Sequence, residues 1–169
     1  FFLAILKYMT YVEKQKLLEI KIMSHSVVEV YIHFIFSTKN RKAWLQPEVE
    51  DRLFPYLGGI ARKQKAGLLD INGTLDHVHL SVKMPATITI AKLIGDLKAL
   101  SSGWLKQRGL QEFSWQEGHG AFSFSRIQIA MVRRYIQNQK IHHKTKTFDE
   151  EMQAYAKRFG FEWYPDPES

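Results

Sequence analysis

The sequence near the middle of the chain reads DHVHLSV over residues 76–82. Apolar and polar residues alternate along it and β-branched valines recur, a pattern that predicts a β-strand. Residues i and i+2 of a strand point to the same side of a sheet. His77 and His79 are therefore expected about 6.5–7 Å apart on one face. Val78 is expected to point into a core on the other face.

Two imidazoles on one rigid face can hold a divalent metal ion if a third ligand comes from elsewhere in the chain. The plainer interpretation is that one histidine is exposed and the other is an ordinary buried residue. For an isolated His-x-His pair the plainer interpretation is the commoner one. The metal hypothesis for His77 and His79 gains weight from a second group far along the chain, Tyr135 and Gln139.

The composition favours a single domain with a polyanionic partner. The chain has 169 residues, a formal net charge of +7 and no cysteine, and its pI is about 9.5. The positive charge favours nucleic acid, with an anionic membrane as the alternative. The lack of cysteine excludes disulfides, thiolate nucleophiles and iron–sulfur clusters, and it agrees with the cytoplasmic location that we expect.

The first 22 residues are expected to be an upstream extension, followed by one domain over residues 23–169. The apolar run 1–6 is too short to span a bilayer, and no basic segment precedes it. Met23 is the start that we expect for the natural protein. No function is predicted for residues 1–22, and no membrane partner is expected.

The hydrophobic pattern predicts alternating strands and helices. Asn72-Gly73 suggests a local turn or bulge, and Thr147 with Glu150 forms a plausible capping box. The order predicts an α+β fold, a ferredoxin-like four-stranded antiparallel sheet with helices on one face, then a tyrosine-bearing helix and a further helix. Strands are expected at 27–36, 68–75, 77–84 and 121–125, and helices at 47–65, 88–107, 127–143 and 148–159.

The predicted helix 127–143 carries groups suited to phosphate chemistry. Tyr135 and Gln139 are four residues apart and so share a helical face. A tyrosine can act as a nucleophile, and an amide oxygen is a hard metal ligand. Each residue taken singly is more commonly structural. His142 and His143 compete with Gln139 as ligands, although dipole partners or phosphate contacts are the simpler interpretation for both.

Taken together, these motifs resemble those of the small single-tyrosine HUH transposases of bacterial insertion sequences, including relatives associated with repetitive extragenic palindromes. The resemblance covers residues 23–163 and rests on several pieces in order. They are VYIHFIFSTKNR (30–41), DHVHL (76–80), LKALSSGW (97–104), GHGAFS (118–123), YIQNQKIHH (135–143) and TFDEE (147–151).

The resemblance implies a role for each residue of the predicted site. His77 and His79 match the HUH pair, Tyr135 the catalytic tyrosine, and Gln139 the third metal ligand, with Mg²⁺ or Mn²⁺ as the ion. Such proteins cleave single-stranded DNA, form a 5′-phosphotyrosine and rejoin strands without a nucleotide cofactor. They are homodimers that bind hairpins near the ends of the element, and one subunit can complete the site of the other.

The sequence is compatible with more than one biological role. One alternative is a domesticated relative that acts on genomic palindromic repeats. Others are a non-catalytic nucleic-acid-binding module and a metal-dependent hydrolase in which Tyr135 is structural. DNA contacts are expected from basic side chains near the predicted sheet and helices, namely Lys39, Arg41, Lys42, Lys92, Lys98, Arg133 and Arg134.

Overall fold

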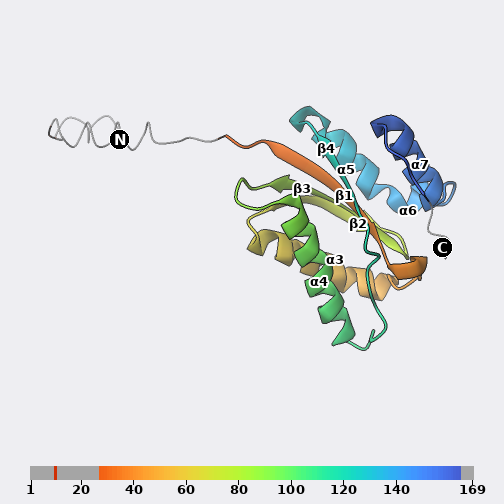
Figure 1. Cartoon of the computed structure of the whole chain (residues 1–169). Coiled ribbons are helices and arrows are strands. Elements are labelled where there is room, and N and C mark those ends of the chain that lie inside the picture. Colours follow the sequence, from red (N-terminus) through yellow and green to blue (C-terminus); the bar gives the residue numbers. More distant parts are fainter. Residues whose placement is uncertain (1–9, 11–26, 165–169) are drawn as a thin grey trace.

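A four-stranded antiparallel sheet forms the centre of the computed structural model (Figure 1), which describes residue 10 and residues 27–164. The spatial order of the strands is β2-β3-β1-β4. The predicted α+β sheet is therefore confirmed. The strands are β1 (Val30–Ser37), β2 (Gly67–Gly73), β3 (His77–Met84) and β4 (Gly120–Phe124).

Helices cover both faces of this sheet (Figure 1). Helices α3 and α4 lie on one face, and α5 to α7 lie over the other. The sequence indicated these helices but not that the last three would cover the second face. Their bounds are α3 (Pro47–Lys63), α4 (Ile90–Lys106), α5 (Ile129–Gln137), α6 (Gln139–His142) and α7 (Phe148–Phe159), with short 3-10 turns η1 (Lys39–Arg41) and η2 (Arg126–Gln128).

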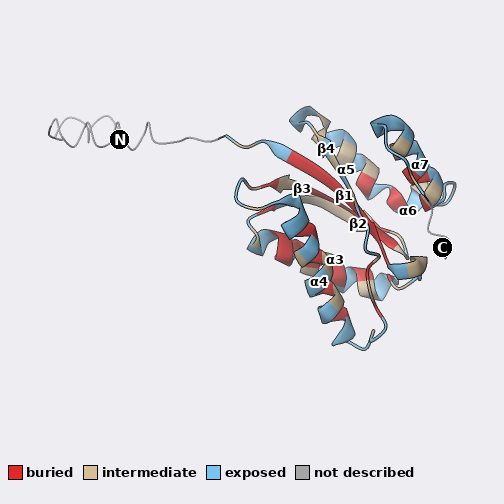
Figure 2. Cartoon of the chain, in the orientation of Figure 1, coloured by how far each residue is buried: buried red, intermediate tan, exposed pale blue. Residues whose placement is uncertain are grey.

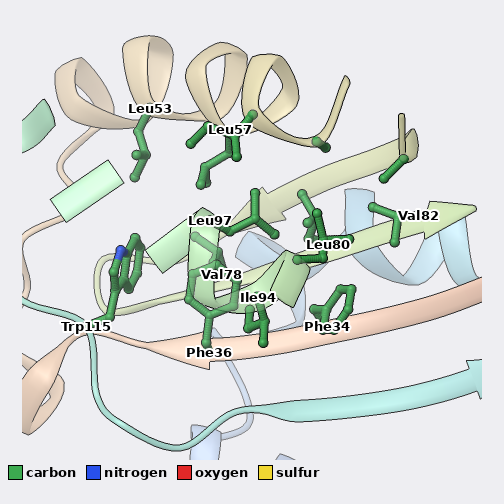
Figure 3. Packing of buried hydrophobic residues seen from close by; sticks show 14 of the residues in the cluster. Phe34, Phe36, Leu53, Leu57, Val78, Leu80, Val82, Ile94, Leu97 and Trp115 are labelled. Atoms are coloured by element: carbon green, nitrogen blue, oxygen red, sulfur yellow. The ribbon is translucent and has the colours of Figure 1, made fainter. Parts of the chain in front are cut away.

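The main hydrophobic core lies between the sheet and helices α3 and α4. Alternate residues of the two central strands point into it, and Figure 3 shows them facing Leu53 and Leu57 of α3. Burial is concentrated there, along β1 and β3 and on the inner sides of both helices (Figure 2). The strand residues in this core are Ile32, Phe34, Phe36, Val78, Leu80 and Val82.

The other face of the same two strands is polar and nevertheless buried. His33 is 4% exposed, His77 1% and His79 0%. A strand alternates its side chains between faces, so the residues that skip the core must lie here. In β1, Ile35 lies directly opposite His79 and Ser37 opposite His77. Helices α5 to α7 cover these imidazoles, and this face therefore holds the predicted site.

Local signals place most helix ends close to the predicted positions. Pro47 opens α3. The Thr89 hydroxyl accepts a hydrogen bond from the Lys92 amide, so α4 begins at Ile90 rather than at residue 88. The predicted capping box at Thr147 and Glu150 is present at the start of α7.

The single helix predicted over residues 127–143 is interrupted, which corrects the prediction. Helix α5 ends at Gln137, and α6 begins again at Gln139. The side-chain amide of Asn72 donates to the Gln137 carbonyl at 2.9 Å. In an unbroken helix that carbonyl would accept from the Ile141 amide, which instead donates to the Asn138 carbonyl at 3.0 Å.

The turn expected at Asn72-Gly73 lies slightly later in the chain. Strand β2 continues through Gly73, and the connection to β3 uses residues 74–76. An irregular register between Leu68 and Asp70 marks a bulge at the other end of β2. The turn moves because Gly73 still pairs with Val78.

Apart from Thr10, the extension predicted over residues 1–22 lies outside the described residues, as does Met23. Within the described part of the chain, none of the helices combines the length and the apolar character that a bilayer crossing requires.

Candidate metal and tyrosine site

Strand β3 places His77 and His79 side by side on the polar face, as the two-residue spacing predicts. Their ring centroids are 5.1 Å apart. The strand lies inside the sheet between β1 and β2, so both of its edges are hydrogen-bonded. The two imidazoles are therefore fixed on a rigid element rather than on a loop.

A carboxylate sets the tautomer of His77. Its Nδ1 lies 2.7 Å from Asp76 Oδ1, so Nδ1 carries the proton and donates it. Arg41 donates to Asp76 Oδ2 from Nε (2.9 Å) and Nη2 (2.6 Å). Burial would raise the pKa of Asp76, but His77 and Arg41 outweigh it and hold the pKa well below its usual range. The Nε2 lone pair of His77 remains available for a ligand.

A second chain of hydrogen bonds orients His79. Its Nδ1 lies 3.0 Å from His33 Nε2, and His33 Nδ1 lies 3.3 Å from the Tyr155 hydroxyl. Burial lowers the pKa of His33 to about 3 and that of His79 well below its usual value, so both rings are neutral. His79 Nε2 is buried without a hydrogen-bond partner among the described residues.

Helix α5 brings Tyr135 to the same imidazoles. Its ring centroid lies 6.0 Å from that of His79 and 6.1 Å from that of His33. Its hydroxyl donates a hydrogen bond to Glu151 Oε1. Tyr135 is partly exposed, so its oxygen is held near the histidines without being sealed inside the protein.

Gln139 lies at the same site, fully buried at the start of α6. Its amide nitrogen is 3.4 Å from Glu151 Oε1. Its carbonyl oxygen is buried without a partner within the described part of the structure. The structure thus brings Tyr135 and Gln139 to one place, although the break at Asn138 puts them on separate helices.

Two further residues, Glu151 and His143, complete a group that we call the His/Glu cluster. It consists of His77, His79, His143 and Glu151, whose donor atoms all lie within 4.8 Å of one another. His143 Nε2 is 3.1 Å from His77 Nε2 and 3.2 Å from Glu151 Oε2. Its Nδ1 donates to the Lys146 carbonyl at 2.9 Å, which leaves Nε2 free of its proton.

Sequence reasoning missed Glu151 and gave His143 a lesser role. One signal for Glu151 was present: it falls on the apolar face of α7 between Phe148 and Tyr155, where a charged residue is unusual. It is 2% exposed, and burial raises its pKa to about 8 even though Arg41 acts in the opposite direction.

The residues present fit a divalent metal ion. Unpartnered buried polar atoms are rare in proteins, and here His79 Nε2 and Gln139 Oε1 are both of this kind. Imidazole nitrogens suit Zn²⁺, Cu²⁺, Fe²⁺ and Ni²⁺, whereas carboxylate and amide oxygens suit Mg²⁺, Ca²⁺ and Mn²⁺. The donor set is compatible with a divalent ion and does not select one metal.

The predicted DNA-contact residues are dispersed rather than gathered at this site. Lys39 and Lys42 line a separate surface pocket. Lys92 pairs with Asp96 on α4, across the sheet from Tyr135. Arg41 alone is tied into the site through Asp76. A role in DNA binding stays a prediction for each of them.

The remaining predicted contacts also have protein partners or exposed positions. The Lys98 ammonium donates to the carbonyl oxygens of residues 116–118, and burial lowers its pKa to about 8. Arg133 donates to Asp70 Oδ2 at 2.6 Å and to the Leu69 carbonyl at 3.0 Å. Arg134 is exposed on α5.

Comparisons with known proteins identify the family. Residues 26–139 match the family model described as IS200-like transposase. A crystal structure from Deinococcus radiodurans R1 with a provisional transposase assignment is 27% identical, with a TM-score of 0.54, and the match covers 69% of this chain and 95% of that one.

A second solved structure supports the fold alone, because its identity is low. It is a REP-associated tyrosine transposase bound to a REP hairpin, 13% identical, with a TM-score of 0.56 and coverage of 85% of this chain and 90% of that one. No curated protein matches the chain. The family match spans well over half of the sequence, so this protein belongs to the IS200-like transposase family.

Proposed function

We propose that this transposase cleaves and rejoins single-stranded DNA at hairpin-marked ends through a 5′-phosphotyrosine on Tyr135. The supporting observation is the placement of the Tyr135 hydroxyl on Glu151, within the same buried group as His77 and His79. A binding module would need no such arrangement of a nucleophile beside buried imidazole nitrogens.

His77, His79 and Gln139 would hold the divalent ion, with His143 and Glu151 beside them. When bound, the ion would draw charge from the phosphate that is attacked. The hydrogen bonds that His77 Nδ1 donates to Asp76 and His79 Nδ1 donates to His33 keep the lone pairs of both Nε2 atoms directed at this place. Mg²⁺ and Mn²⁺ are the ions that we propose.

Cleavage in this proposal is a transesterification at phosphorus. The Tyr135 oxygen forms a bond to phosphorus, and the bond from phosphorus to the 3′ oxygen breaks. The phenolic proton passes to Glu151, which already accepts the hydrogen bond of the phenol and which takes this proton when its carboxyl group is ionised, and the departing 3′ oxygen takes a proton from water.

Rejoining reverses these steps with a different 3′ hydroxyl. That hydroxyl attacks phosphorus, the tyrosyl oxygen leaves, and the phenol regains its proton. One phosphate ester replaces another at every stage, so the sequence of reactions needs no nucleotide cofactor. We further propose that the active form is a homodimer.

Covalent trapping tests this function. Purified protein is incubated with Mg²⁺ or Mn²⁺ and single-stranded oligonucleotides taken from both DNA flanks of the gene. We expect an adduct that survives denaturing electrophoresis, that EDTA prevents and that Tyr135→Phe abolishes. Tyr56→Phe is the matched control, because Tyr56 stacks on Trp104 on the far side of the sheet.

An undiminished adduct in Tyr135→Phe would overturn the assignment of the nucleophile. The position of the palindromes then separates the two biological roles. Palindromes at both ends of one element would indicate a mobile element, whereas palindromes scattered through the genome would indicate a domesticated relative.

A further inference from the structure

A pocket of about 320 Å³ adjoins the tyrosine site, bordered by β4, α5 and α7. Tyr135, His33 and Glu151 belong both to its lining and to the site described above. Pockets that bind small organic groups begin at about 300 Å³. A molecule held there would therefore touch the side chain that we propose as the nucleophile.

One wall of this pocket is aromatic. Phe122 from β4 and Tyr155 from α7 stack with centroids 4.5 Å apart, and Phe159 stacks on Phe122 at 4.8 Å. The planes of each pair lie within about 30° of parallel. Phe159 is 46% exposed, and Met131 on the α5 side is 53% exposed. Large apolar side chains thus remain accessible to a flat ligand.

The charged groups of the lining favour an anion. Lys146 and Arg158 are exposed and basic, and Glu151, the acidic residue among the described lining residues, is almost fully buried. Ser123 and Gln128 add polar groups that can reach the edge of a ring. Aromatic faces flanked by basic side chains are the usual way in which proteins hold single-stranded nucleic acid.

We propose that this pocket binds one base of the single-stranded DNA, next to the phosphate that Tyr135 attacks. The inference rests on the proposed function, because it takes the strand to pass over Tyr135. A base lies one sugar away from its own phosphate, so a phosphate on the Tyr135 oxygen brings an adjoining base to the aromatic wall. The pocket would thereby set the position of cleavage along the strand.

Affinity for a simple strand is the first test. We measure the dissociation constant of a short fluorescein-labelled oligothymidine by fluorescence anisotropy in EDTA, where no cleavage occurs. Phe159→Ala should weaken binding about tenfold, as expected for the loss of one stacking partner. Arg158→Gln should weaken it too, and less so at high salt.

Each variant has a matched control close by on the chain. Tyr164→Ala removes an exposed aromatic side chain near the end of α7, and Lys157→Gln removes one positive charge from the helix that carries Arg158. Neither residue lines the pocket. Both controls should bind oligothymidine like the unchanged protein.

Photo-crosslinking then locates the base. 5-Iodouracil is placed at successive positions of an oligonucleotide that gives the adduct, and crosslinked peptides are sequenced by mass spectrometry. We expect crosslinks to Phe122, Tyr155 or Phe159 only from a position that adjoins the cleaved phosphate.

Several outcomes would overturn the inference. One is an adduct on Tyr135 with unchanged affinities and no crosslink to the pocket, which leaves the proposed function intact. Another is a change in sedimentation on Phe159→Ala without a change in DNA affinity, which would assign this surface to a second copy of the chain. By contrast, weaker oligothymidine binding by Phe159→Ala and Arg158→Gln in a protein that forms no Tyr135 adduct would support the base-binding site and refute the proposed nucleophile.

Discussion

Arg41 supports the His/Glu cluster through Asp76, without contributing a ligand atom itself. Its guanidinium is 3.8 Å from the centre of the Phe148 ring and donates twice to Asp76, which holds His77. Its own backbone has φ of 53°, a left-handed conformation that non-glycine residues seldom adopt. Such strain costs on the order of 1 kcal/mol, so the surrounding contacts must outweigh it.

Removing this guanidinium should weaken metal binding at His77. We expect Arg41→Met to lower the affinity for Mn²⁺ about tenfold, the usual effect of losing a partner behind a ligand. Arg41→Lys should restore part of the affinity, because lysine keeps the charge but not the planar fork. Isothermal titration calorimetry measures both.

The control for this prediction is Arg133→Met, which breaks a similar pair with Asp70. It should leave Mn²⁺ affinity unchanged. Equal affinities in Arg41→Met and the unchanged protein would mean that Asp76 orients His77 without help.

At the scale of elements, the turn between β2 and β3 depends on the close packing of Gly73 against the backbone of His77 and Val78. A Cβ added to Gly73 would lie 2.3 Å from the His77 carbonyl oxygen and 3.2 Å from the Val78 Cα. Both are backbone atoms that cannot rotate away. The two strands can pair this tightly ahead of His77 only because Gly73 has no side chain.

Gly73→Ala should therefore destabilise the protein by roughly 1–3 kcal/mol, since the strand carrying His77 must move. Gly59→Ala on α3 is the matched control, because a Cβ there meets nothing within 4 Å. It should stabilise the protein by roughly 0.5–1 kcal/mol, as alanine favours a helix over glycine. Urea unfolding gives both free energies, and a neutral Gly73→Ala would contradict the steric argument.

At the scale of the whole molecule, local signals predicted the sheet but not the complete site. Alternation in residues 77–82 set the faces of β3, and the Thr147–Glu150 capping box set the start of α7. The break at Asn138 depends on Asn72, which is far away in sequence. No local pattern contains that contact, so the predicted continuous helix was wrong.

The same reason explains why the cluster was only half predicted. His77 and His79 follow from the period of one strand. Glu151 joins them only because α7 packs against the polar face of the sheet, which is a tertiary event. A charged residue on an apolar helix face indicates that something is buried with it, but not which partner.

Burying these imidazoles should make the metal-free fold sensitive to acid. The pKa of His33 is about 3 in the folded protein and near 6.5 when unfolded. Between these values the unfolded chain binds more protons, so stability is full above pH 6.5 and falls toward pH 3. The neutral His33 ring alone should lower the free energy of unfolding at pH 5 by about 2 kcal/mol relative to its value above pH 6.5.

Urea unfolding in EDTA at pH 7 and pH 5 measures this loss. The free energy of unfolding of His33→Asn should fall less between these two pH values than that of the unchanged protein. His119→Asn removes an exposed imidazole before β4, so its free energy of unfolding should fall between pH 7 and pH 5 almost as much as that of the unchanged protein. An identical loss in His33→Asn would place the acid sensitivity elsewhere.

Along strand β3, alternate side chains belong to the hydrophobic core on one face of the sheet and to the His/Glu cluster on the other. Insertion or deletion of one residue at the start of β3, within the paired strand, would exchange the two faces for the residues that follow it. Imidazoles would then enter the hydrophobic core, and valine side chains would face Tyr135. Lineages of this protein can therefore vary β3 by substitution, while length changes must fall in the connections on either side.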